Sequence, residues 1–284
     1  MAAHSKENFR NNGKHSKLTM SYTFYSIKTR KRQDEGMWAG ENFEGLVRSS
    51  QNRTLFQIFK RHLKKTNLKI LEAGCGMGTW VFNLEKMGHS VIGIDYMEST
   101  IRKLKDYDPD FPVQQGDVEN LDFPDNTFDV YVSLGVLEHF KEGPHQALKE
   151  ARRVLKPDGL VFITVPYLSL LRKLVAHPMR DLYFLLRKIQ NKKYYFWEYR
   201  YSKEELENFL KSTGFKIIDI DIDDYQNNDN RHHIGLCADF FFLRSKQGEI
   251  WELNLLGKLL LCMLKIASPW YFCSGLHMVA INKK

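Results

Sequence analysis

Short apolar runs alternate with amphipathic stretches along the middle of the chain. The runs typical of strands lie at residues 69–73, 90–94, 112–115, 128–133 and 160–165. Apolar residues at helical spacing lie at residues 51–65, 80–87, 99–107 and 144–155. Because strands and helices take turns, the pattern predicts an α/β fold with a mostly parallel sheet covered by helices on both faces.

The last part of the chain adds two more strands to this prediction. In Lys216–Asp223 the isoleucines at 218, 220 and 222 alternate with aspartates. A strand with one buried face and one solvent-exposed face is typical of a sheet edge, and the carboxylates would discourage pairing with another sheet. His277–Asn282 is predicted to be the final strand, which gives a seven-stranded sheet.

Two segments do not follow the alternation of strands and helices. They span residues 167–201 and 225–275, and we interpret them as insertions over the candidate site. We therefore predict an N-terminal helical segment with a cap helix at residues 1–67, followed by one domain at residues 68–284 that carries both insertions.

Composition narrows the class of protein. The 284 residues include 43% hydrophobic and 27% charged residues, which excludes wholesale disorder. The four cysteines form no Cys-x-x-Cys pair, so a disulfide scaffold or a structural zinc site is not expected. The N-terminus has no apolar core of a secretory signal, and we expect a cytoplasmic protein. The net charge of +8 favours anionic partners without choosing among them.

A glycine-rich turn and three acids suggest a nucleotide site. Gly74, Gly76 and Gly78 follow the first predicted strand of the sheet, where they let backbone N–H groups approach a ligand. Asp95 and Asp117 follow the next two strands, and ligands of open α/β sheets lie beyond such strand ends. NAD is not expected, because Thr79 replaces the third glycine of the dinucleotide motif and Glu72 would repel a pyrophosphate. A carboxylate at Glu72 suits a ligand with an ammonium group.

These residues resemble the class I S-adenosylmethionine-dependent methyltransferases. The matching stretches are Leu71–Gly78, Gly93–Asp95, Gly116–Asp129, Leu137–Phe140 and Arg153–Gly159, with weaker similarity over Tyr201–Ile222. The resemblance implies a Rossmann-like, doubly wound sheet and S-adenosylmethionine as cofactor. The residues implied to hold it are Glu72, Gly74, Cys75, Gly76, Gly78, Asp95, Tyr96, Met97, Asp117, Val118, Ser133 and Leu134. Among them, Glu72 would contact the methionine end, Asp95 the ribose and Asp117 the adenine.

His139 is the candidate catalytic base, because its ordinary pKa suits proton transfer near neutral pH. A purely structural role for His139 remains an alternative. The stretch before it also resembles the Glu-x-x-Glu-His motif of ubiquinone-biosynthesis O-methyltransferases, in which acids and histidine bind a metal. Gly135 stands at the first glutamate position, so we predict no metal. Arg200, in an aromatic stretch, is a candidate partner for a substrate carboxylate or phosphate.

The function predicted from the sequence is S-adenosylmethionine-dependent O-methylation of a small-molecule or lipid-linked acceptor. The alternatives are N- or C-methylation, a non-catalytic scaffold with the same fold and an RNA-modifying enzyme. No specific nucleic acid partner is expected, since the basic runs at residues 28–32, 60–65 and 187–193 are scattered. Residues 253–272 form an apolar stretch that either packs on the protein itself or lies in the plane of a membrane surface. The oligomeric state stays open.

Overall fold

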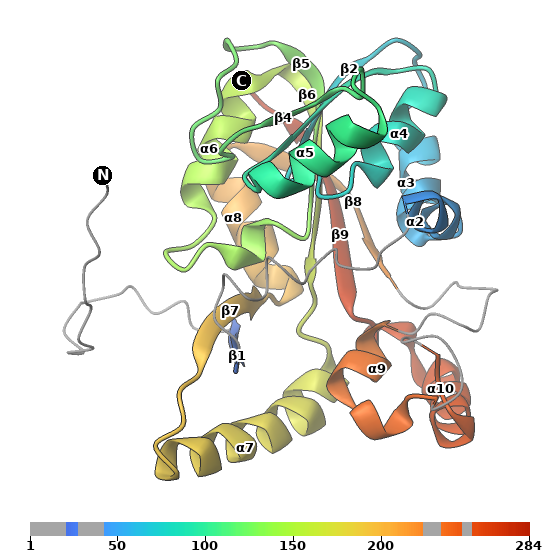
Figure 1. The fold of residues 1–284 in the computed structure, drawn as a ribbon, viewed down its shortest axis with the longest axis vertical. Coiled ribbons are helices and arrows are strands. Elements are labelled where there is room, and N and C mark those ends of the chain that lie inside the picture. Colours follow the sequence, from blue (N-terminus) through green and yellow to red (C-terminus); the bar gives the residue numbers. More distant parts are fainter. Residues whose placement is uncertain (1–20, 28–42, 224–233, 246–251) are drawn as a thin grey trace.

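The computed structural model describes residues 21–27, 43–223, 234–245 and 252–284. Its centre is a seven-stranded sheet with the order β4-β3-β2-β5-β6-β9-β8 (Figure 1). The strands are β2 (Lys69–Ala73), β3 (Ser90–Asp95), β4 (Val113–Gln115), β5 (Phe128–Leu134), β6 (Leu155–Pro166), β8 (Phe215–Ile222) and β9 (Gly275–Asn282). β9 alone runs in the direction opposite to the other six strands of this sheet. The predicted mostly parallel α/β sheet is confirmed.

Helices cover both faces of the sheet. They are α2 (Phe43–Ser50), α3 (Thr54–His62), α4 (Thr79–Lys86), α5 (Glu98–Tyr107), α6 (His145–Val154) and α8 (Lys203–Thr213). Apolar side chains of α2 to α5 pack on one face, and those of α6 and α8 pack on the other. The middle strands are buried on both sides, which explains why they read as continuous apolar runs in the sequence.

The edge strand β8 departs from the predicted alternation. A bulge between Ile217 and Asp219 interrupts its pairing with β9. Ile218 is therefore 41% exposed, whereas Asp223 just beyond the strand is buried and forms an ion pair with Arg53. The prediction that every isoleucine faces the core and every aspartate faces water is wrong. The extra residue at the bulge reverses which side chains point to each face of the strand.

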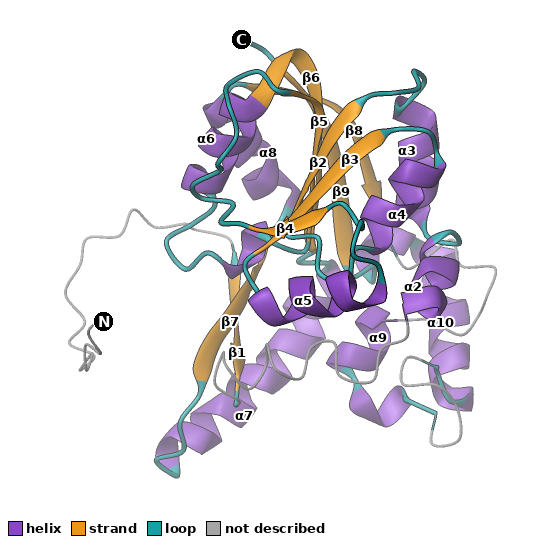
Figure 2. Cartoon of the chain, turned by 45° about the horizontal axis from the view of Figure 1, so that its top comes forward, coloured by secondary structure: helices purple, strands orange, loops and turns teal. Residues whose placement is uncertain are grey.

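A second group of elements lies beyond the ends of β6 and β9, and we call it the accessory layer (Figures 1 and 2). It consists of β1 (Tyr22–Ser26), η2 (Arg172–Ala176), α7 (His177–Ile189), β7 (Tyr195–Arg200), α9 (Ile234–Asp239), η3 (Phe241–Leu243), α10 (Leu255–Ala267) and η4 (Pro269–Tyr271). The N-terminal region is thus not entirely helical, because β1 pairs antiparallel with β7. The basic run at residues 28–32 lies outside the described residues.

Candidate cofactor and active site

The glycine loop between β2 and α4 is held in a shape that other residues would disturb. Gly74, Gly76 and Gly78 have φ angles of 84°, 47° and 66°. A Cβ atom on Gly74 would overlap the side chain of Val136. The N–H groups of Gly74 and Cys75 both donate to the carbonyl of Ile94 at 2.8 Å. Glycine is needed at position 74 both for its backbone angle and for this close packing.

Asp95 joins the loops that follow two neighbouring strands. It is 4% exposed, and one carboxylate oxygen accepts the N–H of Gly76 at 2.9 Å while the other accepts the N–H of Met97 at 2.9 Å. Asp95 therefore lies where the loops after β2 and β3 meet, at the strand ends beyond which ligands of open α/β sheets bind. The predicted neighbours Gly76, Asp95 and Met97 are thus brought together.

Glu72 is a buried acid with an unused oxygen. The side chain is 2% exposed, and its Oε2 has no hydrogen-bond partner within the described part of the chain. Burial raises the pKa of Glu72 well above its ordinary value, the backbone N–H of Val81 opposes this shift, and the charge of Asp95 adds to it. A buried carboxyl of this kind is costly without a partner, and a ligand ammonium group would supply one. This orphaned oxygen fits the methionine end of the implied cofactor.

The remaining predicted cofactor residues line neighbouring strand ends. Tyr96 is 50% exposed, and its carbonyl accepts a hydrogen bond from the side chain of Gln115 at 3.2 Å, which ties the ends of β3 and β4 together. Asp117 is exposed and Val118 is buried directly after it. Of the other predicted cofactor residues, Ser133 and Leu134 end β5 and Cys75 lies in the glycine loop.

The side chains of Ser133 and Cys75 are both buried but have different surroundings. The Oγ of Ser133 is buried without a hydrogen-bond partner among the described residues. The thiol of Cys75 is buried against its own loop.

His139 lies between the sheet and the accessory layer. Its Nδ1 is 2.8 Å from the carbonyl oxygen of Trp197, and the two rings meet edge to face at 4.9 Å. A carbonyl only accepts, so Nδ1 carries the hydrogen and the lone pair of the neutral ring is on Nε2. This contact orients a candidate base through a residue 58 positions away.

Glu138, His139 and Glu198 offer ligand atoms that all lie within 4.8 Å of one another. The sequence pattern missed Glu198, because β7 and the segment that carries Glu138 and His139 are far apart in the chain and meet only in the fold. Two carboxylates and one imidazole are ligands that a divalent cation accepts. The prediction of no metal remains untested.

Arg200 is not available to a ligand, and that prediction is wrong. Its side chain is 4% exposed and donates to Asp239 at 2.7 Å and to Nε2 of His177 at 2.9 Å. Arg172 donates to the other oxygen of Asp239 at 2.6 Å. Arg200 therefore joins the two insertions to each other instead of binding substrate. Nothing in the local sequence signals this, because His177 and Asp239 are 23 and 39 residues from Arg200.

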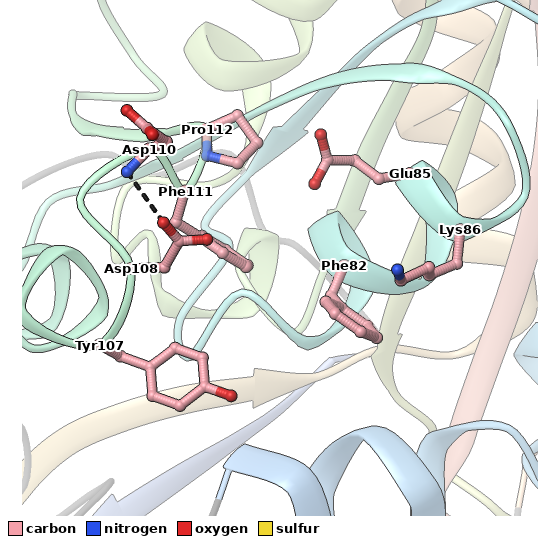
Figure 3. A pocket seen from close by; sticks show the side chains of 8 residues that line it. All are labelled: Phe82, Glu85, Lys86, Tyr107, Asp108, Asp110, Phe111 and Pro112. Atoms are coloured by element: carbon pink, nitrogen blue, oxygen red, sulfur yellow. Dashed lines mark hydrogen bonds between the residues drawn. The ribbon is translucent and has the colours of Figure 1, made fainter.

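A separate cavity of about 390 Å³ lies between α4 and the end of α5. Figure 3 shows its lining, in which the N–H of Asp110 donates to the carboxylate of Asp108. Carboxylates of Glu85, Asp108 and Asp110 surround it, and it shares no residue with the predicted cofactor site. We assign it no role in the chemistry.

Fold and site together define a Rossmann-like nucleotide-binding domain whose strand-end acids suit a cofactor with an ammonium group. Residues 71–163 match the family model of a methyltransferase domain. This part of the chain belongs to the class I S-adenosylmethionine-dependent methyltransferase family.

Several known proteins are similar to the chain. A demethylmenaquinone methyltransferase of Staphylococcus saprophyticus is 33% identical over 43% of this chain and 54% of its own length. The mitochondrial ubiquinone biosynthesis O-methyltransferase of Schizosaccharomyces pombe is 27% identical over 64% of this chain and 67% of its own. The crystal structure of a Pyrococcus horikoshii protein superposes with a TM-score of 0.56 at 20% identity, covering 90% of this chain and all of that one. The matched part spans about half the length, or less, of several curated relatives.

Proposed function

We propose that this protein binds S-adenosylmethionine and methylates an oxygen atom of a small-molecule acceptor. The observation that carries this proposal is the buried Oε2 of Glu72, which lacks a partner two residues before a glycine loop braced by Asp95. When bound, the cofactor supplies an electrophilic methyl group on a sulfonium sulfur. A pure scaffold with the same fold, which binds no small molecule, would have no use for a desolvated acid at this place.

The chain's own residues would divide the binding between them. Glu72 would accept from the ammonium group, and the backbone of the loop at Gly74–Gly78 would enclose the methionine end together with Ser133 and Leu134. Asp95 would accept from the ribose hydroxyls. Tyr96, Met97, Asp117 and Val118 would enclose the adenine. These assignments rest on the positions of the residues at adjoining strand ends.

His139 is our candidate for the group that takes the acceptor's proton. The carbonyl of Trp197 holds the tautomer with the lone pair on Nε2, and this nitrogen would accept the hydroxyl proton as the oxygen becomes a nucleophile. Glu198 and Glu138 lie beside the ring, where their negative charge would stabilise the imidazolium that forms.

Two observations support an acceptor of quinone-like or lipid-linked kind. The relatives above include enzymes named for demethylmenaquinone and ubiquinone biosynthesis. In addition, α10 leaves Leu255 and Ile266 75% and 84% exposed, which supports peripheral contact of residues 253–272 with a membrane. No helix among the described residues is long and apolar enough to cross a bilayer. A cytoplasmic location remains a prediction.

Titration calorimetry with S-adenosylmethionine and its demethylated product tests cofactor binding. The wild type should bind both, and Glu72→Gln should weaken both by at least about tenfold, since each carries the ammonium group and a charge-assisted hydrogen bond is lost. Asp110→Asn, in the separate cavity, is the matched control and should bind normally. An absence of heat with the wild type would contradict the proposal.

A transfer assay with labelled methyl groups then tests the chemistry. Membrane lipid extract, polar metabolites and RNA are offered separately as acceptors, and label is expected in the lipid fraction. His139→Gln should keep cofactor affinity but lose about 10²–10⁴-fold in transfer. Label that enters only RNA would overturn the acceptor class in favour of RNA modification.

A further inference from the structure

Exposed apolar side chains are concentrated in the accessory layer. Among the described residues, 22 large hydrophobic side chains are exposed. Nine of them lie in residues 170–189 and eight in residues 241–271. Single exposed hydrophobics are normal on protein surfaces, but a concentration of this kind marks a contact with another apolar surface.

Helix α7 carries its apolar face outward. The side that packs on the protein holds Phe184, His177 and Arg180, whose guanidinium stacks on the ring of Phe24 at 3.5 Å. The opposite side holds six apolar residues that are 48–70% exposed, namely Met179, Leu182, Tyr183, Leu185, Leu186 and Ile189. A helix that rests on its own fold normally buries its apolar stripe. In α7 this stripe faces solvent, so it is available for a partner.

Helix α10 has two apolar stripes, and only one of them is used by the fold. Gly257 and Leu261 are buried, and they face a small apolar cluster with Leu253 and Leu243. The second stripe is 57–84% exposed and consists of Leu255, Leu256, Leu259, Met263 and Ile266. The expectation that this stretch packs on the protein itself therefore holds for one stripe alone.

Basic side chains accompany both exposed stripes. Arg187 and Lys188 fall on the two borders of the stripe on α7, and Lys192 and Lys193 follow this helix. On α10, Lys258 and Lys265 fall between the buried and the exposed stripe. Residues 170–193 contain a single acid, Asp181, and it accepts a hydrogen bond from Tyr22. The surface is therefore apolar with a basic border, which complements anionic lipid.

We propose that α7 and α10 together form one docking surface for an anionic phospholipid bilayer, with both helices lying in the plane of the interface. Both lie on the same side of the sheet, beyond the ends of β6 and β9 (Figures 1 and 2). Each has 13 residues and is about 20 Å long, which is too short for a hydrocarbon core of about 30 Å. The proposal rests on the proposed function in one respect: docking in this orientation turns the substrate side of the site toward the lipid.

Co-sedimentation with vesicles tests this surface. Vesicles of phosphatidylcholine alone are compared with vesicles that also contain phosphatidylglycerol, at low and at high salt. The wild type should bind the anionic vesicles and be released in large part by salt. Leu182→Glu with Leu186→Glu on α7, and Leu256→Glu with Leu259→Glu on α10, should each weaken binding by at least about tenfold. Ile218→Glu, an exposed apolar residue on β8, is the matched control and should bind like the wild type.

Three outcomes would overturn the proposal. One is that the wild type does not bind anionic vesicles. Another is that only the α10 variant loses binding, which would remove α7 from the surface. The third is that sedimentation velocity without lipid shows a dimer that both variants dissociate, which would assign the surface to a second copy of the chain. Calorimetry with S-adenosylmethionine is run on every variant, so loss of docking with intact cofactor binding is distinguished from failure of the methyltransferase assignment.

Discussion

The strand-end loops and the accessory layer of this protein are built in opposite ways. At the strand ends, buried acids face backbone N–H groups and leave Glu72 with an unused oxygen, so a ligand completes the structure. In the accessory layer, the buried charges satisfy one another, and the apolar side chains of α7 and α10 face outward. One region thus has an unsatisfied buried acid, which suits a small ligand, and the other has an unsatisfied apolar surface, which suits a larger partner.

The two regions also differ in what stabilises them. The sheet separates two large apolar clusters, whereas the apolar cluster of the accessory layer has eight buried members. Asp239 on α9 accepts from Arg172 and Arg200, which belong to the first insertion, and so joins both insertions. A region with few apolar contacts depends more heavily on such a buried ionic group.

The largest effect is expected from Asp239→Ala, which should destabilise the accessory layer and leave the packing of the sheet unchanged. Two arginines would be left buried without their carboxylate, and the free energy of unfolding should fall by about 3–5 kcal/mol. Urea unfolding followed by circular dichroism measures this. Asp181→Ala, which removes an exposed acid of α7, is the control and should have a much smaller effect. A loss below about 1 kcal/mol for Asp239→Ala would show that the layer does not depend on this group.

Gly74→Ala should damage the strand-end loops and spare the accessory layer. The methyl group would meet Val136, and the φ of 84° is unfavourable for alanine, so we expect a loss of about 2–4 kcal/mol in stability together with weaker cofactor binding. Gly88→Ala is the matched control, because its φ is 88° but nothing lies within 4 Å of the added Cβ. If both variants lost the same stability, the close packing on Val136 would be irrelevant. The double variant Gly74→Ala, Val136→Ala should recover part of the loss.

Asp95→Asn should weaken cofactor binding at the strand ends and leave the docking surface of the accessory layer unchanged. An amide offers one acceptor and one donor, so it cannot accept from both Gly76 and Met97 as the carboxylate does. Affinity for S-adenosylmethionine should fall by about 10- to 100-fold, which corresponds to about 1.5–3 kcal/mol, by titration calorimetry. Vesicle binding through α7 and α10 should not change. Unaltered cofactor affinity would argue against the assigned role of Asp95.

The smallest effect concerns pH and is confined to the accessory layer. Burial and the neighbouring Arg200 lower the pKa of His177 to about 3. A histidine whose pKa is lower in the folded than in the unfolded state takes up a proton on unfolding. Its stabilising effect is therefore complete above pH 6.5, the ordinary value, and is lost progressively as the pH falls toward 3.

His177→Phe keeps a ring that can stack on Tyr22, as the histidine does at 3.5 Å. It should reduce the loss of stability between about pH 6.5 and 5 by about 1 kcal/mol, after allowance for screening. Thermal unfolding across this range measures the slope. An unchanged slope would mean that other groups of the fold set the pH dependence.

Much of the sheet and of its candidate site was predictable from short stretches of sequence. The strands around Ile70, Val91 and Val130 are buried on both faces, so their apolar runs identify them without knowledge of neighbours. Glycines and acids at strand ends are local signals too. The alternation pattern did not predict the bulge at Ile218. A bulge depends on the pairing of β8 with β9, and β9 lies 50 or more residues further along the chain.

The sequence by itself determined the class of fold, the family, and which strands are followed by glycines and acids. These follow from local periodicity and from motifs in a fixed order. Tertiary structure alone decided that Arg200 is enclosed by His177 and Asp239, that Glu198 joins His139, and that α7 turns its apolar face outward. The physical reason is the same in each case. A side chain's partner is chosen by packing between segments far apart in the chain, and periodicity within one segment does not say which of its faces will find a neighbour.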